Sequence, residues 1–107
     1  MDRKESKKIL LADSDRKIHQ RIKQARETKR YHFEFAATGT EALEKMQHFQ
    51  PDLVLVELLL PHIHGIEILK RIRTDSFSKQ IGVILLADHV MMQNYQAALR
   101  NGCDYFL

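Results

Sequence analysis

Residues 53–60 have the sequence LVLVELLL, a run in which Glu57 is the sole polar side chain, and Pro61 follows directly. A continuous apolar run of this length is typical of a strand that is buried on both faces of a parallel sheet. Proline ends such a run because it lacks the backbone N–H that the ladder needs. The stretch therefore predicts a central strand over residues 53–60 that carries one carboxylate, Glu57.

Shorter runs on both sides of this stretch point to one fold class. Four of them predict further strands, at residues 8–12, 31–35, 81–86 and 104–107. The segments between the strands have helical spacing or capping residues and predict helices, at residues 16–29, 38–49, 66–73 and 90–100. In the last helix we expect Tyr95, Ala98 and Leu99 to point inward. Strands that alternate with helices predict an α/β fold, with one parallel sheet covered by helices on both faces.

The composition is that of an ordinary globular domain. The chain has 107 residues, of which 44% are hydrophobic and 29% charged, enough for one domain with its own core. No apolar stretch approaches the roughly 20 residues of a membrane span, and the charged start MDRKESKK is not a secretory signal. A single cysteine, Cys103, excludes an internal disulfide and fits a reducing cytosol, so we expect a cytoplasmic protein. Residues 1–7 are expected to form a basic leader and residues 8–107 the domain.

Positive charge is concentrated near the start of the chain. Eleven of the 17 lysines and arginines lie within the first 30 residues, while the formal net charge of the whole chain is only +3. Such a cluster indicates a patch for nucleic acid or for an acidic partner, or simply the solvated face of a helix. Because no groove-reading motif or interleaved aromatic accompanies the charge, nucleic-acid binding through this domain is not expected.

Polar loop residues follow three of the predicted strands. They lie at residues 13–15, 57–64 and 87–88. Ligands of open parallel sheets bind beyond the carboxyl ends of the strands, at the point where the strand order reverses. The sequence therefore predicts a functional site where these three loops meet.

Five landmarks in these strands and loops carry a family resemblance: KKILLADSD, YHFEFAATGTEAL, PDLVLVELLLPHIHGIEIL, IGVILLAD and NGCDYFL. From Lys8 to Leu107 the chain resembles the CheY-like receiver domain of bacterial two-component response regulators. The resemblance implies a flavodoxin-like, doubly wound sheet of five parallel strands in the order 2-1-3-4-5, with the family's final helix not in this chain. It also implies a role in signal transduction.

The resemblance places the family's phosphorylation machinery on residues that have changed type. Members of the family generally phosphorylate themselves on an aspartate after the third strand, with Mg²⁺ held by two acids after the first. Here the phosphoacceptor position is Glu57, and the acid pair has become Asp13 and Ser14. The hydroxyl position after the fourth strand is Ala87, which cannot donate a hydrogen bond. The switch aromatic is Phe106, which lacks a hydroxyl, and the family's lysine would lie beyond the last residue of this sequence.

These changes imply a degenerate acidic pocket with its phosphotransfer chemistry lost. We therefore expect a pseudo-receiver that is not an enzyme and that acts by protein–protein interaction, independently of aspartyl phosphorylation. No cofactor or metal is expected, although a weak Mg²⁺ site at Asp13 and Glu57 stays open, because affinity for hard cations follows the number of oxygen ligands. Glu57 is either a mimic of the activated state or a tolerated polar residue at a strand end. In place of Mg²⁺, Arg16 or Lys17 is expected to fold over the two carboxylates.

A protein partner or a fused output domain is expected to carry the signal onward. The family's interaction face corresponds here to Met91, Met92, Tyr95 and Phe106, for which core packing is the alternative. The lack of a helix after the fifth strand is expected to leave an apolar patch. That patch indicates either a truncated chain or a homodimer in which a second copy supplies the cover.

Other chemistry stays open at the same residues. One alternative is a receiver that is still phosphorylated at a non-standard acid, Asp13 or Asp15. Another is a phosphohydrolase, because Asp13 to Asp15 weakly resembles the DxD nucleophile loop of haloacid-dehalogenase-type phosphatases. His62 and His64 near Glu57 have the chemistry of a transition-metal site or a pH sensor, with exposed loop histidines as the plainer interpretation.

Overall fold

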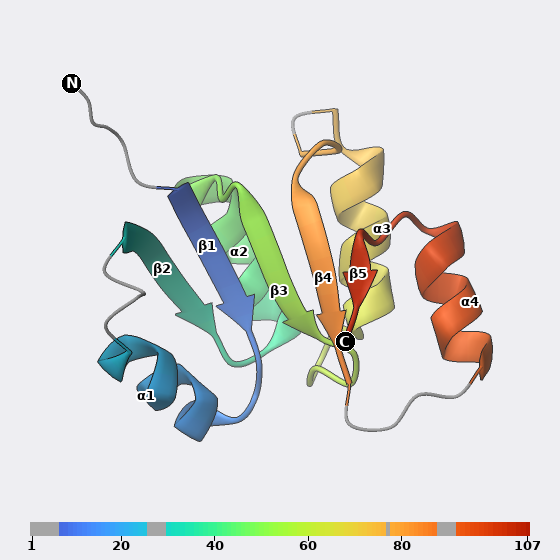
Figure 1. Ribbon diagram of the computed structural model, residues 1–107. Helices are drawn as coiled ribbons and strands as arrows, with labels where there is room; N and C mark the ends of the chain where they lie inside the picture. The colour runs from blue at the N-terminus through green and yellow to red at the C-terminus, as the bar shows by residue number, and fades with distance from the viewer. Residues whose placement is uncertain (1–6, 26–29, 77, 88–91) are drawn as a thin grey trace.

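The computed structural model describes residues 7–25, 30–76, 78–87 and 92–107. Its strands are β1 (Lys7–Ala12), β2 (Tyr31–Ala36), β3 (Leu53–Glu57), β4 (Gly82–Leu86) and β5 (Tyr105–Phe106). Its helices are α1 (Arg16–Gln24), α2 (Gly39–Phe49), α3 (Gly65–Thr74) and α4 (Met92–Arg100). The strands form one parallel sheet in the order β2-β1-β3-β4-β5, so the predicted fold class and strand order are confirmed (Figure 1).

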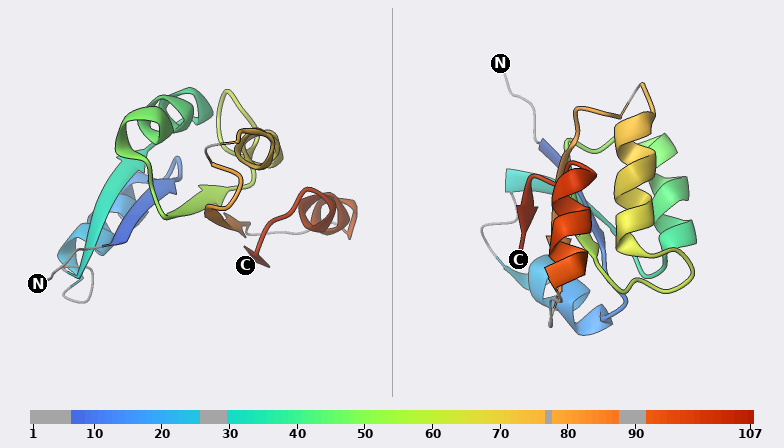
Figure 2. Two further views of the ribbon diagram at one scale, coloured as in Figure 1. Left: turned by 90° about the horizontal axis from the view of Figure 1, so that it is seen from above. Right: turned by 90° about the vertical axis from the view of Figure 1, so that its right-hand side faces the viewer.

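The helices cover the two faces of the sheet unequally. Helix α1 lies on one face, beside β1 and β2, whereas α2, α3 and α4 lie on the other (Figures 1 and 2). The core lies on the three-helix face, where alternate residues of the inner strands meet apolar residues of the helices. Its fully buried members include Leu10, Val54, Val56, Val83 and Leu85 from the strands, and Ile68, Leu69, Ile72 and Ala98 from the helices. None of the helices in the described part of the chain is long and apolar enough to cross a membrane.

The central strand is shorter than the apolar run that predicted it. The predicted strand over residues 53–60 ends at Glu57, and Leu58 and Leu59 form a turn. Leu58 stays buried and its N–H donates to the Leu86 carbonyl at 2.7 Å, whereas the Leu59 side chain is 70% exposed. The run is therefore apolar for two reasons: its first part is a buried strand that ends at Glu57, and part of the loop that follows is packed into the protein. Hydropathy alone does not distinguish a buried strand from a packed loop.

Two expectations about the last helix were wrong. Ala98 points inward and is fully buried, but Tyr95 and Leu99 are 42% and 51% exposed. On the opposite face of the sheet, Tyr105 and Leu107 at β5 are also largely exposed. The residues 26–29 and 90–91 of the predicted helices lie outside the described residues.

Candidate functional site

The loops after β1 and β3 meet at the carboxyl edge of the sheet. These two strands are parallel neighbours, and Ala12 lies opposite Val56 at their ends. The next residues therefore face one another across a short gap. The Ser14 backbone N–H donates to Glu57 Oε1 at 2.8 Å, and the Ser14 hydroxyl donates to the same oxygen at 2.9 Å. The structure thus brings Ser14 and Glu57, both singled out by the sequence, into direct contact, with Ser14 donating two hydrogen bonds to the Glu57 carboxylate.

Asp13 is the buried acid of the site. Its residue is only 5% exposed, its N–H donates to the Ala36 carbonyl at 2.9 Å, and its Oδ1 accepts from the Asp15 N–H at 2.8 Å. Burial raises the pKa of the Asp13 carboxyl, and the charges of Glu57 and Asp15 raise it further. The hydrogen bond from Asp15 and the nearby His19 ring pull the pKa of Asp13 the other way without cancelling the rise.

The raised pKa of Asp13 predicts that removing its charge stabilises the folded protein at neutral pH. Because this pKa is higher in the folded than in the unfolded chain, ionised Asp13 costs stability at neutral pH and protonated Asp13 does not. Asp13→Asn keeps the Oδ1 acceptor and removes the charge, so we expect a higher urea midpoint than wild type at pH 7. The gain should shrink as the pH is lowered through the raised pKa. The exposed Glu44→Gln is the control, and an Asp13→Asn gain that grows on acidification would contradict the assignment.

His19 is part of the site although the sequence did not single it out. The residue is 7% exposed, and its Nε2 lies 2.8 Å from the Asp13 carbonyl oxygen. Because a carbonyl only accepts, the ring donates from Nε2 in this contact. The ring also packs against the ring of Phe35 in β2, tilted by 36° with centroids 5.1 Å apart. Its helical spacing to Ile22 was the available signal, but a histidine among lysines and arginines looked like surface.

The acids are not neutralised in the way the sequence suggested. No ion pair joins Arg16 or Lys17 to Asp13 or Glu57, all four of which are among the described residues. Ser14, rather than either cation, contacts the Glu57 carboxylate. That hypothesis was wrong because hydrogen bonds from the β1–α1 loop reach Glu57 directly, without a long side chain folding back.

Asp15 caps the first helix of the chain. It is the N-cap of α1, and its side chain accepts from the Lys17 N–H at 2.9 Å. A carboxylate at a helix N-terminus is stabilised by the free N–H groups of the first turn. Asp15 is therefore engaged with its own helix.

The positions that correspond to the family's hydroxyl residue and switch aromatic, Ala87 and Phe106, lie after β4 and in β5. Ala87 follows β4, and its N–H donates to the Leu107 carbonyl at 2.9 Å. Phe106 is half-buried against the core, with its ring 5.8 Å from that of Tyr95. Of the expected interaction face, Tyr95 is exposed, Met91 lies outside the described residues, and nothing is described of the Met92 side chain.

The loop between β3 and α3 forms the third wall of the site. Gly39 N–H donates to the Pro61 carbonyl at 2.9 Å, and Gly65 N–H donates to the Leu58 carbonyl at 2.8 Å, so the loop is held at both ends. His62 has a left-handed backbone with φ of 73°, and His64 caps α3 by accepting from the Ile66 N–H at Nδ1. No group of three or more His, Cys, Asp or Glu side chains with metal-binding geometry occurs among the described residues.

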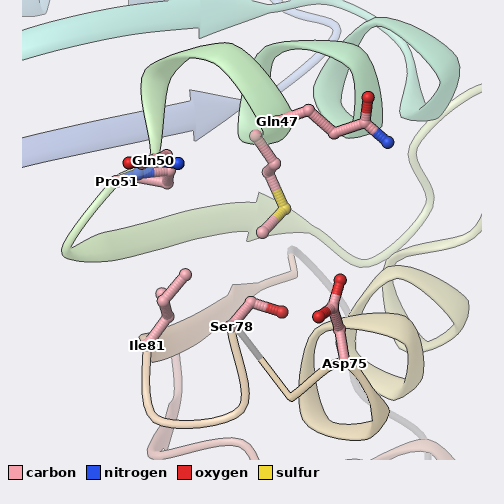
Figure 3. A pocket seen from close by; sticks show the side chains of 7 residues that line it. Gln47, Gln50, Pro51, Asp75, Ser78 and Ile81 are labelled. Atoms are coloured by element: carbon pink, nitrogen blue, oxygen red, sulfur yellow. The ribbon is translucent and has the colours of Figure 1, made fainter.

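A separate cleft of about 450 Å³ lies elsewhere on the molecule (Figure 3). It is lined by Met46, Gln47, Gln50, Pro51, Asp75, Ser78 and Ile81. These residues come from the end of α2 and from the chain that leads into β3 and β4, so the cleft lies at the amino edge of the strands. It is therefore not part of the site around Glu57.

Comparisons with known proteins agree with this fold. Residues 9–107 match the response regulator receiver domain family. Response regulator MprA of Mycobacterium sp. (strain KMS) is 28% identical over 100 residues, which are 94% of this chain but only 43% of that relative's length. The receiver domain protein (CheY-like) of Methanospirillum hungatei JF-1 superposes with a TM-score of 0.86 at 28% identity, over 96% of this chain and 81% of that one. Chemotaxis response regulator CheY4 of Vibrio cholerae does so with a TM-score of 0.86 at 26% identity, over 96% and 86% of the two chains. The chain therefore belongs to the response regulator receiver domain family of two-component signalling.

Proposed function

We propose that this receiver domain is a signalling module that works without aspartyl phosphorylation and acts through contact with a protein. The observation that carries the proposal is the pair of hydrogen bonds from Ser14 to Glu57 Oε1. They engage the carboxylate at the family's phosphoacceptor position with a neutral donor from its own chain. The carboxylate is longer than that of aspartate by one methylene, and one of its oxygens already accepts two hydrogen bonds, which favours a structural role over attack on a phosphoryl group.

The surrounding groups support the same proposal. A transferring phosphoryl group is stabilised by cations and by hydrogen-bond donors aimed at its oxygens. Ala87 offers no side-chain donor. Ser14 stands at one of the two positions where members of the family generally have an acid that helps to hold Mg²⁺. Asp13 and Glu57 are the remaining carboxylates, and one Glu57 oxygen already accepts two hydrogen bonds. These residues fit a hard divalent cation poorly, so we propose that Mg²⁺ binds weakly or not at all.

The output of such a module passes to a protein partner or to a fused output domain. Receiver domains in general are non-enzymatic signalling modules, and this proposal assigns the chain no catalytic residue. Glu57 held by Ser14 acts here as a fixed part of the structure, so the conformation of the pocket does not depend on a phosphoryl donor. The alternative of a receiver phosphorylated at Asp13 or Asp15 is an outcome of the test below.

The direct test is intact mass spectrometry after incubation with Mg²⁺ and acetyl phosphate. We expect no added phosphoryl mass on the native chain. The matched variant is Ser14→Asp with Glu57→Asp, which restores the family's carboxylates, and we expect it to bind Mg²⁺ at least tenfold more tightly than the native chain in a calorimetric titration.

Either of two results would sink the proposal. A stable phosphoryl adduct on the native chain would show that phosphotransfer survives, and mapping it would name the acid that replaced the missing aspartate. Native Mg²⁺ affinity equal to that of the double variant would show that Ser14 and Glu57 do not weaken the metal site.

A further inference from the structure

Strand β2 is an open edge of the sheet, and a groove follows it. In the described sheet β2 pairs with β1 alone (Figure 1). A groove of about 390 Å³ wraps around its outer side, with α1 on one wall and α2 on the other. We call this the β2 groove, and its lining residues are Arg16, His19, Lys23, Phe33, Glu34, Phe35, Ala37, Glu41 and Lys45. An unpaired strand edge is a template on which another extended chain can pair.

The hydrogen bonds show which backbone groups face the β2 groove. The Ala36 carbonyl accepts from the Asp13 N–H, so the backbone of Ala36 faces β1. The backbone N–H and C=O groups of successive residues in a strand point alternately to its two sides. The backbone groups of Glu34 therefore also point toward β1, while those of Phe33 and Phe35 point outward, to the open edge. The Lys45 ammonium donates to the Phe35 carbonyl from the open side, which agrees with this assignment. The outward N–H groups of Phe33 and Phe35 are thus placed for an added strand.

The two walls of the groove differ in charge. On the α2 wall, Lys45 lies 3.6 Å from Glu34 and 3.7 Å from Glu41, so its charge is balanced. On the α1 wall, Arg16 and Lys23 have no carboxylate partner among the described residues. Lys23 instead lies over the Phe35 ring, 5.0 Å from its centroid. The α1 wall therefore carries two unbalanced positive charges above an aromatic floor.

Arg16 also lies where the helix itself does not favour a positive charge, whereas Lys23 lies in the last turn, where the helix favours one. Arg16 and Lys17 form the first turn of α1, which contains no acidic residue. Positive charge at a helix N-terminus is unfavourable because it faces the free N–H groups of the first turn. Arg16 and Lys23 are seven residues apart, with His19 between them, and so form one stripe along the side of α1 that lines the groove. A charge that costs helix stability and has no internal partner indicates an external one.

We propose that the β2 groove binds an extended acidic segment of a protein partner as an additional strand beside β2. Side chains of such a strand point alternately to the two walls. Acidic residues at alternate positions would meet Arg16 and Lys23, while neutral residues between them would face the balanced α2 wall. The proposal assigns the β2 groove as the surface that contacts a partner. It rests on the proposed function only in that the domain acts by protein contact, and it does not depend on Ser14 or Glu57.

The test uses a defined probe and amide hydrogen exchange. The probe is a fluorescein-labelled nine-residue peptide in which glutamate alternates with valine and threonine, and its control has glutamine in place of every glutamate. We expect the acidic peptide to bind measurably and the glutamine control not to bind. The affinity of the acidic peptide should fall as the salt concentration is raised. At saturation, exchange at the amides of Phe33 and Phe35 should slow, while the amides of Glu34 and Ala36 should not change.

A matched pair of double variants separates the groove from general charge. Arg16→Gln with Lys23→Gln should weaken binding about fivefold, as expected for two partly exposed ion pairs. Lys17→Gln with Arg21→Gln removes the same charge from α1 outside the groove lining and should change affinity less than twofold.

Several outcomes would overturn the inference. They are no binding of the acidic peptide, equal losses in both double variants, or no added protection at Phe33 and Phe35. Tighter binding of a duplex DNA oligonucleotide, lost in the same variants, would assign the surface to nucleic acid instead. A phosphoryl adduct in the acetyl phosphate experiment would refute the proposed function and leave these results unaffected.

Discussion

Replacing Gly39 by alanine is expected to destabilise the fold by about 3 kcal/mol, because the new methyl group has no room. A Cβ at Gly39 would lie 2.4 Å from Ile63 Cβ, 2.6 Å from the Ile63 carbonyl oxygen and 2.9 Å from Ile63 Cα. Two of these atoms belong to backbone, so a side-chain rotation cannot relieve the clash. The Gly39 N–H also bonds the Pro61 carbonyl at 2.9 Å, and a shift would break that bond. Urea unfolding measures the loss.

The control for this prediction is a glycine whose neighbour can move. A Cβ at Gly82 would lie 3.1 Å from Leu53 Cδ1, the end of a flexible side chain. Gly82→Ala should therefore change the free energy of unfolding by about 1 kcal/mol or less. If Gly39→Ala is as stable as Gly82→Ala, the β3–α3 loop is not packed against the start of α2 as described. The same loop follows Glu57, so the result also reports on how firmly the site is held.

Replacing Arg73 by alanine is expected to cost about 3 kcal/mol, since one guanidinium connects α3 to the two loops that precede β4 and β5. Its Nε donates to the Gly102 carbonyl at 2.8 Å, and its Nη1 donates to the Lys79 carbonyl at 3.1 Å and to the Ile81 carbonyl. Its Nη2 lies 2.9 Å from Asp104 Oδ2. The Arg73 side chain is only 20% exposed, and its bond to the Ile81 carbonyl is partly buried.

Two further variants test the role of Arg73. Arg73→Lys should recover little of the loss, because an ammonium cannot reproduce the planar fork of donors. Arg71→Ala removes an exposed arginine of the same helix, whose contact with Glu67 is an exposed i,i+4 pair at 3.3 Å. That variant should cost about 0.5 kcal/mol or less. Thermal and urea unfolding of the three variants would refute the assignment if Arg71→Ala and Arg73→Ala lost equal stability.

Local sequence patterns determined the order of elements and the edge at which the site lies. Apolar runs marked the inner strands, and helical spacing and capping residues marked the helices, because all of these depend on near neighbours in the chain. Alternation of strands and helices implies a parallel sheet, and parallel strands bring their carboxyl ends to one edge. The sequence by itself therefore places Asp13, Ser14 and Glu57 at the same edge of the sheet.

Only the tertiary structure decided how those residues interact. Ser14 and Glu57 are 43 residues apart, and whether Ser14 or a lysine reaches the carboxylate depends on how the loops after β1 and β3 pack against each other. Burial of His19 and the network of Arg73 likewise depend on which distant segments pack against each helix. The exposure of Tyr95 and the end of β3 at Glu57 were missed for the same reason. Hydropathy records which side chains avoid water, whereas packing between segments distant in sequence decides which surface each one contacts.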